Sequence, residues 1–265
     1  MLGTLPVLKG SPGSQVGVNL IDTVVTQSIR RLFTHSDEVT VQVRCQPPSK
    51  ILQGSIDSFK MYGRKLLIRR DFWVEEMSFE TDGVSIDFSS VMSGKLRLRQ
   101  PTQAIAQVIL SEEGINRAFQ SDLVTCRLQN LTDPSLTSLS GDEPVTFKNV
   151  VIELHPQNRV FISANTSLPN CGLVPIQMSA TITVERRRRI LFNDAQFLSH
   201  DLPAKVLPVS QLMTEALASI LNEMVDLDRF DLDGVSMRVN RLETQGKFLV
   251  FSGYAQIDHF PGTNF

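Results

Sequence analysis

The sequence lacks most of the signals that assign a function directly. Its 265 residues carry 26 basic and 28 acidic side chains, so the strongly basic footprint of a typical nucleic-acid-binding protein is absent. Cysteine is scarce, and Cys45, Cys126 and Cys171 form no CxxC pair, which favours free thiols and argues against a zinc site. Motifs of the GxSxG, HExxH, GxxxxGKS/T and GxGxxG types do not occur. We therefore expect no enzyme activity, no metal and no cofactor.

Long apolar runs are also missing. No stretch approaches the ~18 consecutive apolar residues of a membrane-spanning helix. The first residues, MLGTLPVLKGSPGSQ, show no basic region followed by a long apolar core, so we expect no cleaved signal peptide. These absences predict a cytoplasmic protein whose contact with a membrane, if there is one, is peripheral.

What is present is typical of a globular chain, with 42% hydrophobic and 20% charged residues. Residues 1–13 are rich in Gly and Pro and predict an extended lead-in, followed by one domain over 14–265. Two stretches have helical periodicity, one from Ser14 and one over 207–225. The inward-facing side chains of the first include Val18, Ile21, Val25 and Ile29, and those of the second are Leu212, Leu217, Ile220, Leu221 and Met224.

The rest of the chain alternates as strands do. EVTVQVRCQ, the segments from Lys50 to Phe88, and runs containing Leu96, Leu98 and then Ala104 to Leu110 predict an antiparallel meander. Ser111 starts a short helix with Phe119 on its apolar side. Residues 130–144 have loop composition. After them come two hairpin-like pairs, the second helix and two strands that join near Gly246.

These patterns predict an α+β fold, in which a curved antiparallel β-sheet is rolled around long amphipathic helices. The halves 14–130 and 145–265 share the same order of elements, but no residue-level match between them identifies a repeat. The interior of such a roll is either filled with side chains or leaves a slot for a ligand, and the sequence is compatible with both.

The segments GSIDSFKMYGRKLLIRRDFWVEEMSFETDGVSIDF and GKLRLRQPTQAIAQVILSEEGINRAFQSDLV carry a family resemblance. The turn TDGVSID, the strands around LRLRQPTQA and the helix SEEGINRAF resemble the LmeA-like phospholipid-binding family over roughly residues 16–260. The resemblance implies a β-rich domain that binds phospholipid, in the style of tubular lipid-binding proteins. These motifs are structural rather than catalytic, and we expect this chain to differ from exported members in having no signal peptide or lipobox cysteine.

The resemblance favours a lipid-binding role for the apolar faces of the two predicted helices. We expect non-enzymatic binding of a phospholipid or another acyl-chain ligand, because each buried CH₂ contributes about 0.8 kcal/mol. The residues expected to line the slot are Val18, Ile21, Val25, Ile29, Phe119, Leu217, Ile220 and Met224. The alternative is a scaffold protein with a filled core that docks a protein partner. An esterase would require a Ser or Cys beside His35, His155, His200 or His259.

Four consecutive arginines, Arg186 to Arg189, stand out in TITVERRRRILFND. Because strand residues alternate between faces, a buried strand here would force two charges into the core, so a hairpin tip is expected. Such a tip is a solvated turn, a contact with lipid headgroups or an anionic membrane surface, or a contact with another partner. Nucleic acid is not expected, because no aromatic platform accompanies the arginines.

Overall fold

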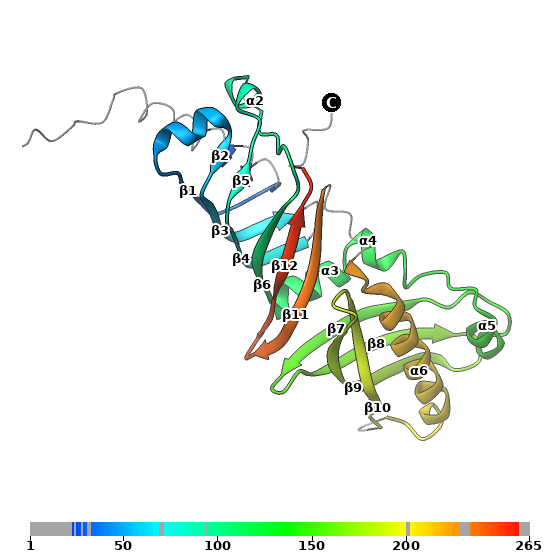
Figure 1. The fold of residues 1–265 in the computed structure, drawn as a ribbon. Helices are drawn as coiled ribbons and strands as arrows, with labels where there is room; N and C mark the ends of the chain where they lie inside the picture. The colour runs from blue at the N-terminus through cyan, green and yellow to red at the C-terminus, as the bar shows by residue number, and fades with distance from the viewer. Residues whose placement is uncertain are drawn as a thin grey trace, which may run out of the picture.

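Two antiparallel sheets dominate the fold (Figure 1). The computed structural model describes residues 23, 25–27, 29–30, 33–68, 72–93, 95–199, 202–227 and 234–259. One sheet has six strands in the order β1-β3-β4-β6-β12-β11, and the other has four in the order β10-β9-β8-β7. A separate two-stranded ribbon pairs β2 with β5.

The elements have the following bounds. The six-stranded sheet consists of β1 (Glu38–Arg44), β3 (Ser58–Ile68), β4 (Phe72–Thr81), β6 (Thr102–Ser111), β11 (Val235–Gln245) and β12 (Phe248–Ile257). The other strands are β2 (Ser55–Ile56), β5 (Val84–Ser85), β7 (Phe147–His155), β8 (Arg159–Leu168), β9 (Gly172–Glu185) and β10 (Arg189–Phe197). The helices are the 3-10 helix η1 (Pro48–Gln53), α2 (Phe88–Met92), α3 (Glu112–Phe119), α4 (Asp122–Thr125), α5 (Pro134–Ser140) and α6 (Leu207–Met224).

The six-stranded sheet combines the beginning and the end of the chain. Its first four strands precede α3, and β12 then pairs antiparallel with β6 along its whole length, from Phe248 opposite Ser111 to Ile257 opposite Thr102. The strand β11 forms one edge of this sheet and lies next to the four-stranded sheet (Figure 1). The predicted antiparallel architecture is confirmed as an open, curved sheet, whereas the enclosure of helices inside a roll stays a prediction.

Helix α6 covers the four-stranded sheet (Figure 1). It packs on β9 and β10 through Met213, Leu217 and Leu221, which are four residues apart and have no exposed surface. No water-sized space therefore touches these side chains, and the core under the middle of α6 is filled. The prediction that Leu212 points inward was wrong: its side chain is 46% exposed, because the buried stripe is set by its neighbour Met213.

Two other sequence predictions need correction. Residues 130–144 were expected to be a loop, yet they contain α5, which Asp133 caps by accepting a hydrogen bond from the backbone N–H of Ser135. The run around Leu96 and Leu98 was expected to be a strand, but it forms only an isolated bridge between Leu98 and Ile86. Ile86 directly follows β5, a strand of only two residues, so there is no long edge along which the ladder could continue.

The N-terminal helix is described only in part. Residues 23, 25–27, 29 and 30 are helical, and Val25 and Ile29 are buried, as predicted. The predicted residues Val18 and Ile21 lie outside the described residues. After the helix, Thr34 and His35 exchange backbone hydrogen bonds with Leu67, which fixes this part of the chain at the end of β3.

Candidate functional site

The arginine run forms the tip of the β9–β10 hairpin, as predicted. Arg186 and Arg187 have φ angles of 48° and 62°, and the backbone N–H of Arg188 donates to the Glu185 carbonyl at 3.1 Å. This combination defines a type I′ turn, whose twist matches the twist of the two strands. The chain therefore avoids burying arginine inside the sheet by turning at this point.

The tip also docks onto the six-stranded sheet. The backbone N–H of Val239 in β11 donates to the Arg187 carbonyl at 2.8 Å, and that of Leu227 donates to the Arg188 carbonyl at 2.8 Å. The Val239 N–H is available because β11 is an edge strand and its register with β12 shifts between Val239 and Arg241. The tip is thus a junction between the two sheets.

The four arginines have different environments. Arg186 and Arg187 are exposed, whereas Arg188 is half-buried. Arg189 is 33% exposed, donates to the Asn222 carbonyl at 3.3 Å and lies 3.6 Å from the Glu185 carboxylate. Arg189 therefore fastens α6 to the hairpin, and Arg186 and Arg187 are the members of the run that present their side chains to solvent.

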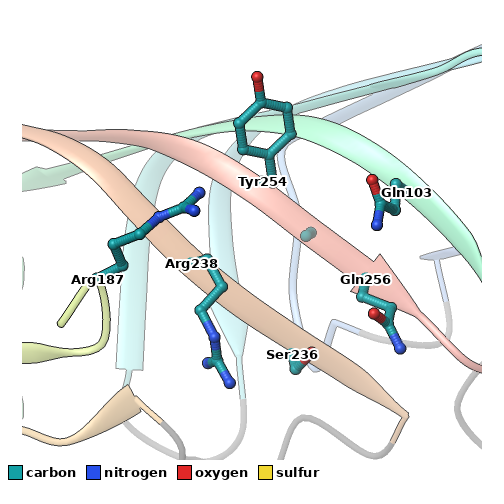
Figure 2. A pocket seen from close by; sticks show the side chains of 7 residues that line it. Gln103, Arg187, Ser236, Arg238, Tyr254 and Gln256 are labelled. Carbon is teal, nitrogen blue, oxygen red and sulfur yellow. The ribbon is translucent and has the colours of Figure 1, made fainter.

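A hollow of about 360 Å³ lies beside this tip (Figure 2). It is lined by Gln103, Arg187, Ser236, Arg238, Tyr254, Ala255 and Gln256. Arg238 and Tyr254 are directly opposite each other on β11 and β12, and the Arg187 guanidinium carbon lies 5.8 Å from the centre of the Tyr254 ring. Among the residues that the structure describes, the lining combines two arginines with hydroxyl and amide groups and includes no carboxylate.

Most of this lining was missed by the sequence reasoning. Only Arg187 belonged to the predicted headgroup residues. The alternation of β11 and β12 places Arg238 and Tyr254 on one face, but it does not show that the arginine tip lies on the same edge. That contact is visible only in the tertiary structure, because it depends on how the two sheets are placed.

The predicted apolar residues divide into two groups. Val25, Ile29 and Leu217 are fully buried in the main core, whereas Phe119, Ile220 and Met224 are half-buried and pack against it. Leu217, Ile220 and Met224 belong to α6 on the four-stranded sheet, and Phe119 ends α3, which packs on both β4 and β7. A common slot formed by all of these residues stays a prediction.

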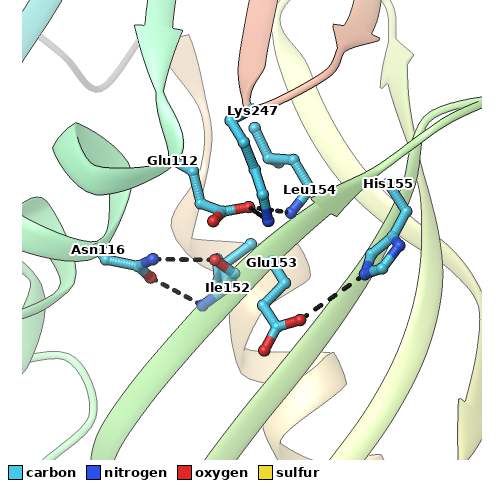
Figure 3. Close-up of polar contacts among 7 residues, drawn as sticks. All are labelled: Glu112, Asn116, Ile152, Glu153, Leu154, His155 and Lys247. Carbon is cyan, nitrogen blue, oxygen red and sulfur yellow. Dashed lines mark hydrogen bonds and ion pairs between the residues drawn. The ribbon is translucent and has the colours of Figure 1, made fainter.

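Polar contacts from α3 hold the two sheets together (Figure 3). The side-chain amide of Asn116 donates to the Ile152 carbonyl at 2.9 Å and accepts from the Ile152 backbone N–H at 2.7 Å. Glu112 accepts from the backbone N–H of Leu154 at 2.7 Å and from the Lys247 ammonium at 2.9 Å. Because β7 is an edge strand, these bonds satisfy backbone groups that have no neighbouring strand.

The comparison with protein families decides the classification. The model of the LmeA-like phospholipid-binding family matches residues 13–253. The chain belongs to this family. No curated protein and no solved structure matches the chain.

The matched range contains most of the features that build the site in this LmeA-like protein. All four strands of the four-stranded sheet, α6 and Arg238 lie inside the range, and Tyr254 follows its last residue directly. Within the described part of the chain, none of the helices has the length and apolar character needed to cross a membrane.

Two histidines of this LmeA-like protein have environments that do not resemble an esterase site. His35 lies 3.1 Å from the Asp37 carboxylate, and His155 packs edge-on against Phe161 with the Glu153 carboxylate 3.8 Å away. Neither is hydrogen-bonded to a Ser or Cys of the part of the chain that the structure describes. No group of three or more His, Cys, Asp or Glu suited to a metal ion occurs among the described residues.

Proposed function

We propose that this protein binds a phospholipid or another acyl-chain lipid without catalysis, at or near a membrane surface. Membership of the LmeA-like phospholipid-binding family is the observation that carries the proposal. In this view the acyl chain contacts half-buried apolar side chains, and the headgroup lies near the arginine tip at Arg186 to Arg189.

Half-buried apolar side chains support the acyl-chain part of the proposal. On the buried face of the six-stranded sheet, Phe79, Val108 and Met237 pack against the core without being fully covered. Ile220 and Met224 of α6 are covered to a similar extent. Each CH₂ of a lipid that leaves water on such a surface contributes about 0.8 kcal/mol, so contact with part of one chain gives useful affinity.

The predicted lipid-binding residues differ in whether a ligand can reach them. Val25, Ile29 and Leu217 can touch a ligand only if the core opens, whereas Phe119, Ile220 and Met224 can do so from their present positions. Because α6 sits on a filled core, we place the acyl chain along the half-buried side chains rather than under the helix.

The perturbed carboxylates are consistent with a protein that is not an enzyme. Hydrogen bonds from the Ser89 and Ser135 hydroxyls lower the pKa of Asp87 and Asp133, and the Lys50 ammonium lowers that of Asp57. Asp87 and Asp133 are helix caps, and Asp57 joins the ends of a short loop. These shifts have structural causes, and none of these residues lines the hollow beside the arginine tip.

The filled core favours one second candidate. A scaffold that docks a protein partner needs a rigid layer, and the tightly packed α6 on the four-stranded sheet provides one. Lipid binding separates the two candidates, because a scaffold of this kind has no reason to retain lipid.

Native mass spectrometry of the purified full chain, incubated with phosphatidylglycerol, tests the proposal. We expect a lipid adduct that Met237→Gln and Met224→Gln each reduce, because a polar amide replaces an apolar contact of similar size. Leu52→Gln is the matched control, since Leu52 is 64% exposed in η1, which follows β1, the edge strand opposite β11. Absence of any adduct, together with absence of binding to vesicles, would refute lipid binding and favour the scaffold.

A further inference from the structure

We propose that the hollow between the β9–β10 tip and the outer face of β11 and β12 is a phosphate-binding site, with Arg187 and Arg238 as its charged residues. The inference deepens the proposed function and rests on it only for the source of the phosphate, which is a lipid headgroup. The chemistry recognised is a phosphate oxyanion, which a guanidinium contacts through charge-assisted hydrogen bonds.

Arg187 is held in place by its backbone rather than by its side chain. The carbonyl of Arg187 accepts the Val239 N–H, and the type I′ turn fixes the direction in which the side chain leaves the tip. The guanidinium lies 5.8 Å from the Tyr254 ring centre, within the range of a cation–π contact. A cation that is already positioned loses less freedom when it binds an anion.

Arg238 is positioned by the same feature of β11. It directly precedes Val239 and faces Tyr254 across the strand pair. One of its N–H groups donates to the Met237 carbonyl at 3.1 Å, which orients the guanidinium. The close approach of β11 to Gly253 depends on glycine, because a Cβ there would lie 2.0 Å from the Arg238 carbonyl oxygen. The bulge that docks the tip therefore also places Arg238.

The remaining lining suits an anion. Ser236 and Tyr254 carry hydroxyl donors, and Gln103 and Gln256 carry amide donors (Figure 2). The nearby carboxylate of Asp258 accepts a hydrogen bond from the Gln256 amide at 2.8 Å and is not part of the lining. A volume of about 360 Å³ is at the small end of the roughly 300–1,000 Å³ typical of small-molecule sites.

An apolar neighbour favours a lipid as the source of the phosphate. Ile105 pairs directly with Tyr254 on the adjacent strand, shares its face and is 63% exposed. The next residues along this row, Glu80 and Lys60, form an ion pair with each other. An exposed Ile and Tyr beside two arginines match the boundary between headgroup and acyl chain. At this boundary, basic side chains contact the anionic headgroups and amphipathic side chains contact the acyl chains.

The run of arginines supplies a matched control. Arg186 and Arg187 are adjacent, exposed and in the same turn with positive φ, yet only Arg187 lines the hollow. Arg186→Asn and Arg187→Asn remove the same charge from the same hairpin. A diffuse attraction to anions would weaken equally in both variants, whereas binding at a built site weakens more in Arg187→Asn than in Arg186→Asn.

The test measures binding of the full chain to glycerol 3-phosphate by calorimetry and to phosphatidylcholine vesicles containing phosphatidic acid by flotation. We expect Arg187→Asn and Arg238→Asn each to weaken both kinds of binding about tenfold or more. The reason is that hydrogen bonds between charged groups are stronger than those between neutral groups. Arg186→Asn should weaken glycerol 3-phosphate binding much less than Arg187→Asn does, because Arg186 does not line the hollow. Arg238→Lys, which keeps the charge but loses the fork geometry, should fall between wild type and Arg238→Asn.

The two proposals fail in different ways. Equal losses for Arg186→Asn and Arg187→Asn with both ligands would overturn the site and leave only diffuse charge. Retained lipid adducts with normal vesicle binding in Arg187→Asn would overturn the site while the proposed lipid binding stands. Binding of glycerol 3-phosphate without any vesicle binding would support the site and overturn a lipid as its source. Thermal unfolding of each variant verifies that the fold is retained.

Discussion

Two hairpin tips of the four-stranded sheet, those of β7–β8 and β9–β10, dock on β11 by different means. Both are type I′ turns, with positive φ at Gln157 and Asn158 in the β7–β8 tip and at Arg186 and Arg187 in the β9–β10 tip. In the first tip the Asn158 amide donates to the Leu242 carbonyl at 3.1 Å and accepts from the Thr244 N–H at 2.9 Å.

The β9–β10 tip contacts β11 through a backbone carbonyl instead. Arg187 and Arg188 accept hydrogen bonds from Val239 and Leu227 through their main chains. The polar side chain of Asn158 forms its hydrogen bonds with β11, whereas that of Arg187 stays at the surface and lines the hollow. Docking through the backbone lets one turn hold the sheets together and still leave the side chains of Arg186 and Arg187 exposed.

The largest effect is expected for Gly253→Ala. Its Cβ would lie 2.0 Å from the Arg238 carbonyl, so β11 must move, at a cost of about 3 kcal/mol in the free energy of unfolding. Chemical denaturation measures this loss. Hydrogen exchange should show that the Val239 amide loses more protection than the Thr244 amide. The reason is that the bulge beside Gly253 positions the Val239 N–H that donates to the β9–β10 tip.

Gly246→Ala is the control for that prediction. Gly246, unlike Gly253, has a positive φ, of 59°, and its added Cβ meets no atom within 4 Å, so we expect only the roughly 1 kcal/mol of left-handed strain. Equal losses in the two variants would show that the close approach at Gly253 is unimportant.

The next effect is expected for Asn158→Ala. The change removes both side-chain bonds to β11 and places Ala at a φ of 59°, so we expect a loss of about 2–3 kcal/mol in unfolding free energy. Asn158→Gly removes the same bonds without the backbone strain and should lose about 1 kcal/mol less. A stability within error of wild type for Asn158→Ala would contradict the idea that this side chain holds the junction.

A smaller loss is expected for Asn116→Ala, which removes the clamp between α3 and β7. Two backbone groups of Ile152 lose their partner but lie at an edge where water can replace it, so we expect about 1–2 kcal/mol by denaturation. The exposed Asn193→Ala is a suitable comparison, because Asn193 only contacts the Thr183 hydroxyl within its own hairpin.

The smallest effects are expected within the arginine run. Arg189→Ala removes a bond to Asn222 and a partly exposed ion pair, so we expect a loss of about 0.5–1 kcal/mol. Arg187→Ala and Arg186→Ala should agree with each other to within about 0.5 kcal/mol, since the docking bonds belong to the backbone. A markedly larger loss of unfolding free energy for Arg187→Ala would mean that its side chain, like that of Asn158, helps to hold the two sheets together.

Local patterns predicted much of the fold. The alternation in β7 to β10, the Ser111 helix start and the Gly246 turn were all readable, because each depends on a few neighbouring residues. Helix α5 was missed although Asp133, Pro134 and Gly141 form a complete set of caps around it. Its Ser- and Thr-rich composition concealed a helix that capping rather than periodicity defines.

The sequence by itself determined the antiparallel strands and the position of the four arginines at a turn, because alternating faces forbid four consecutive charges in a buried strand. It also determined the family. Only the tertiary structure decided that the tip meets β11, that Arg187 and Arg238 line one hollow and that Arg189 is used to fasten α6. These contacts join residues far apart in the chain through an edge strand and its bulge, and no local pattern encodes which edge a turn will reach.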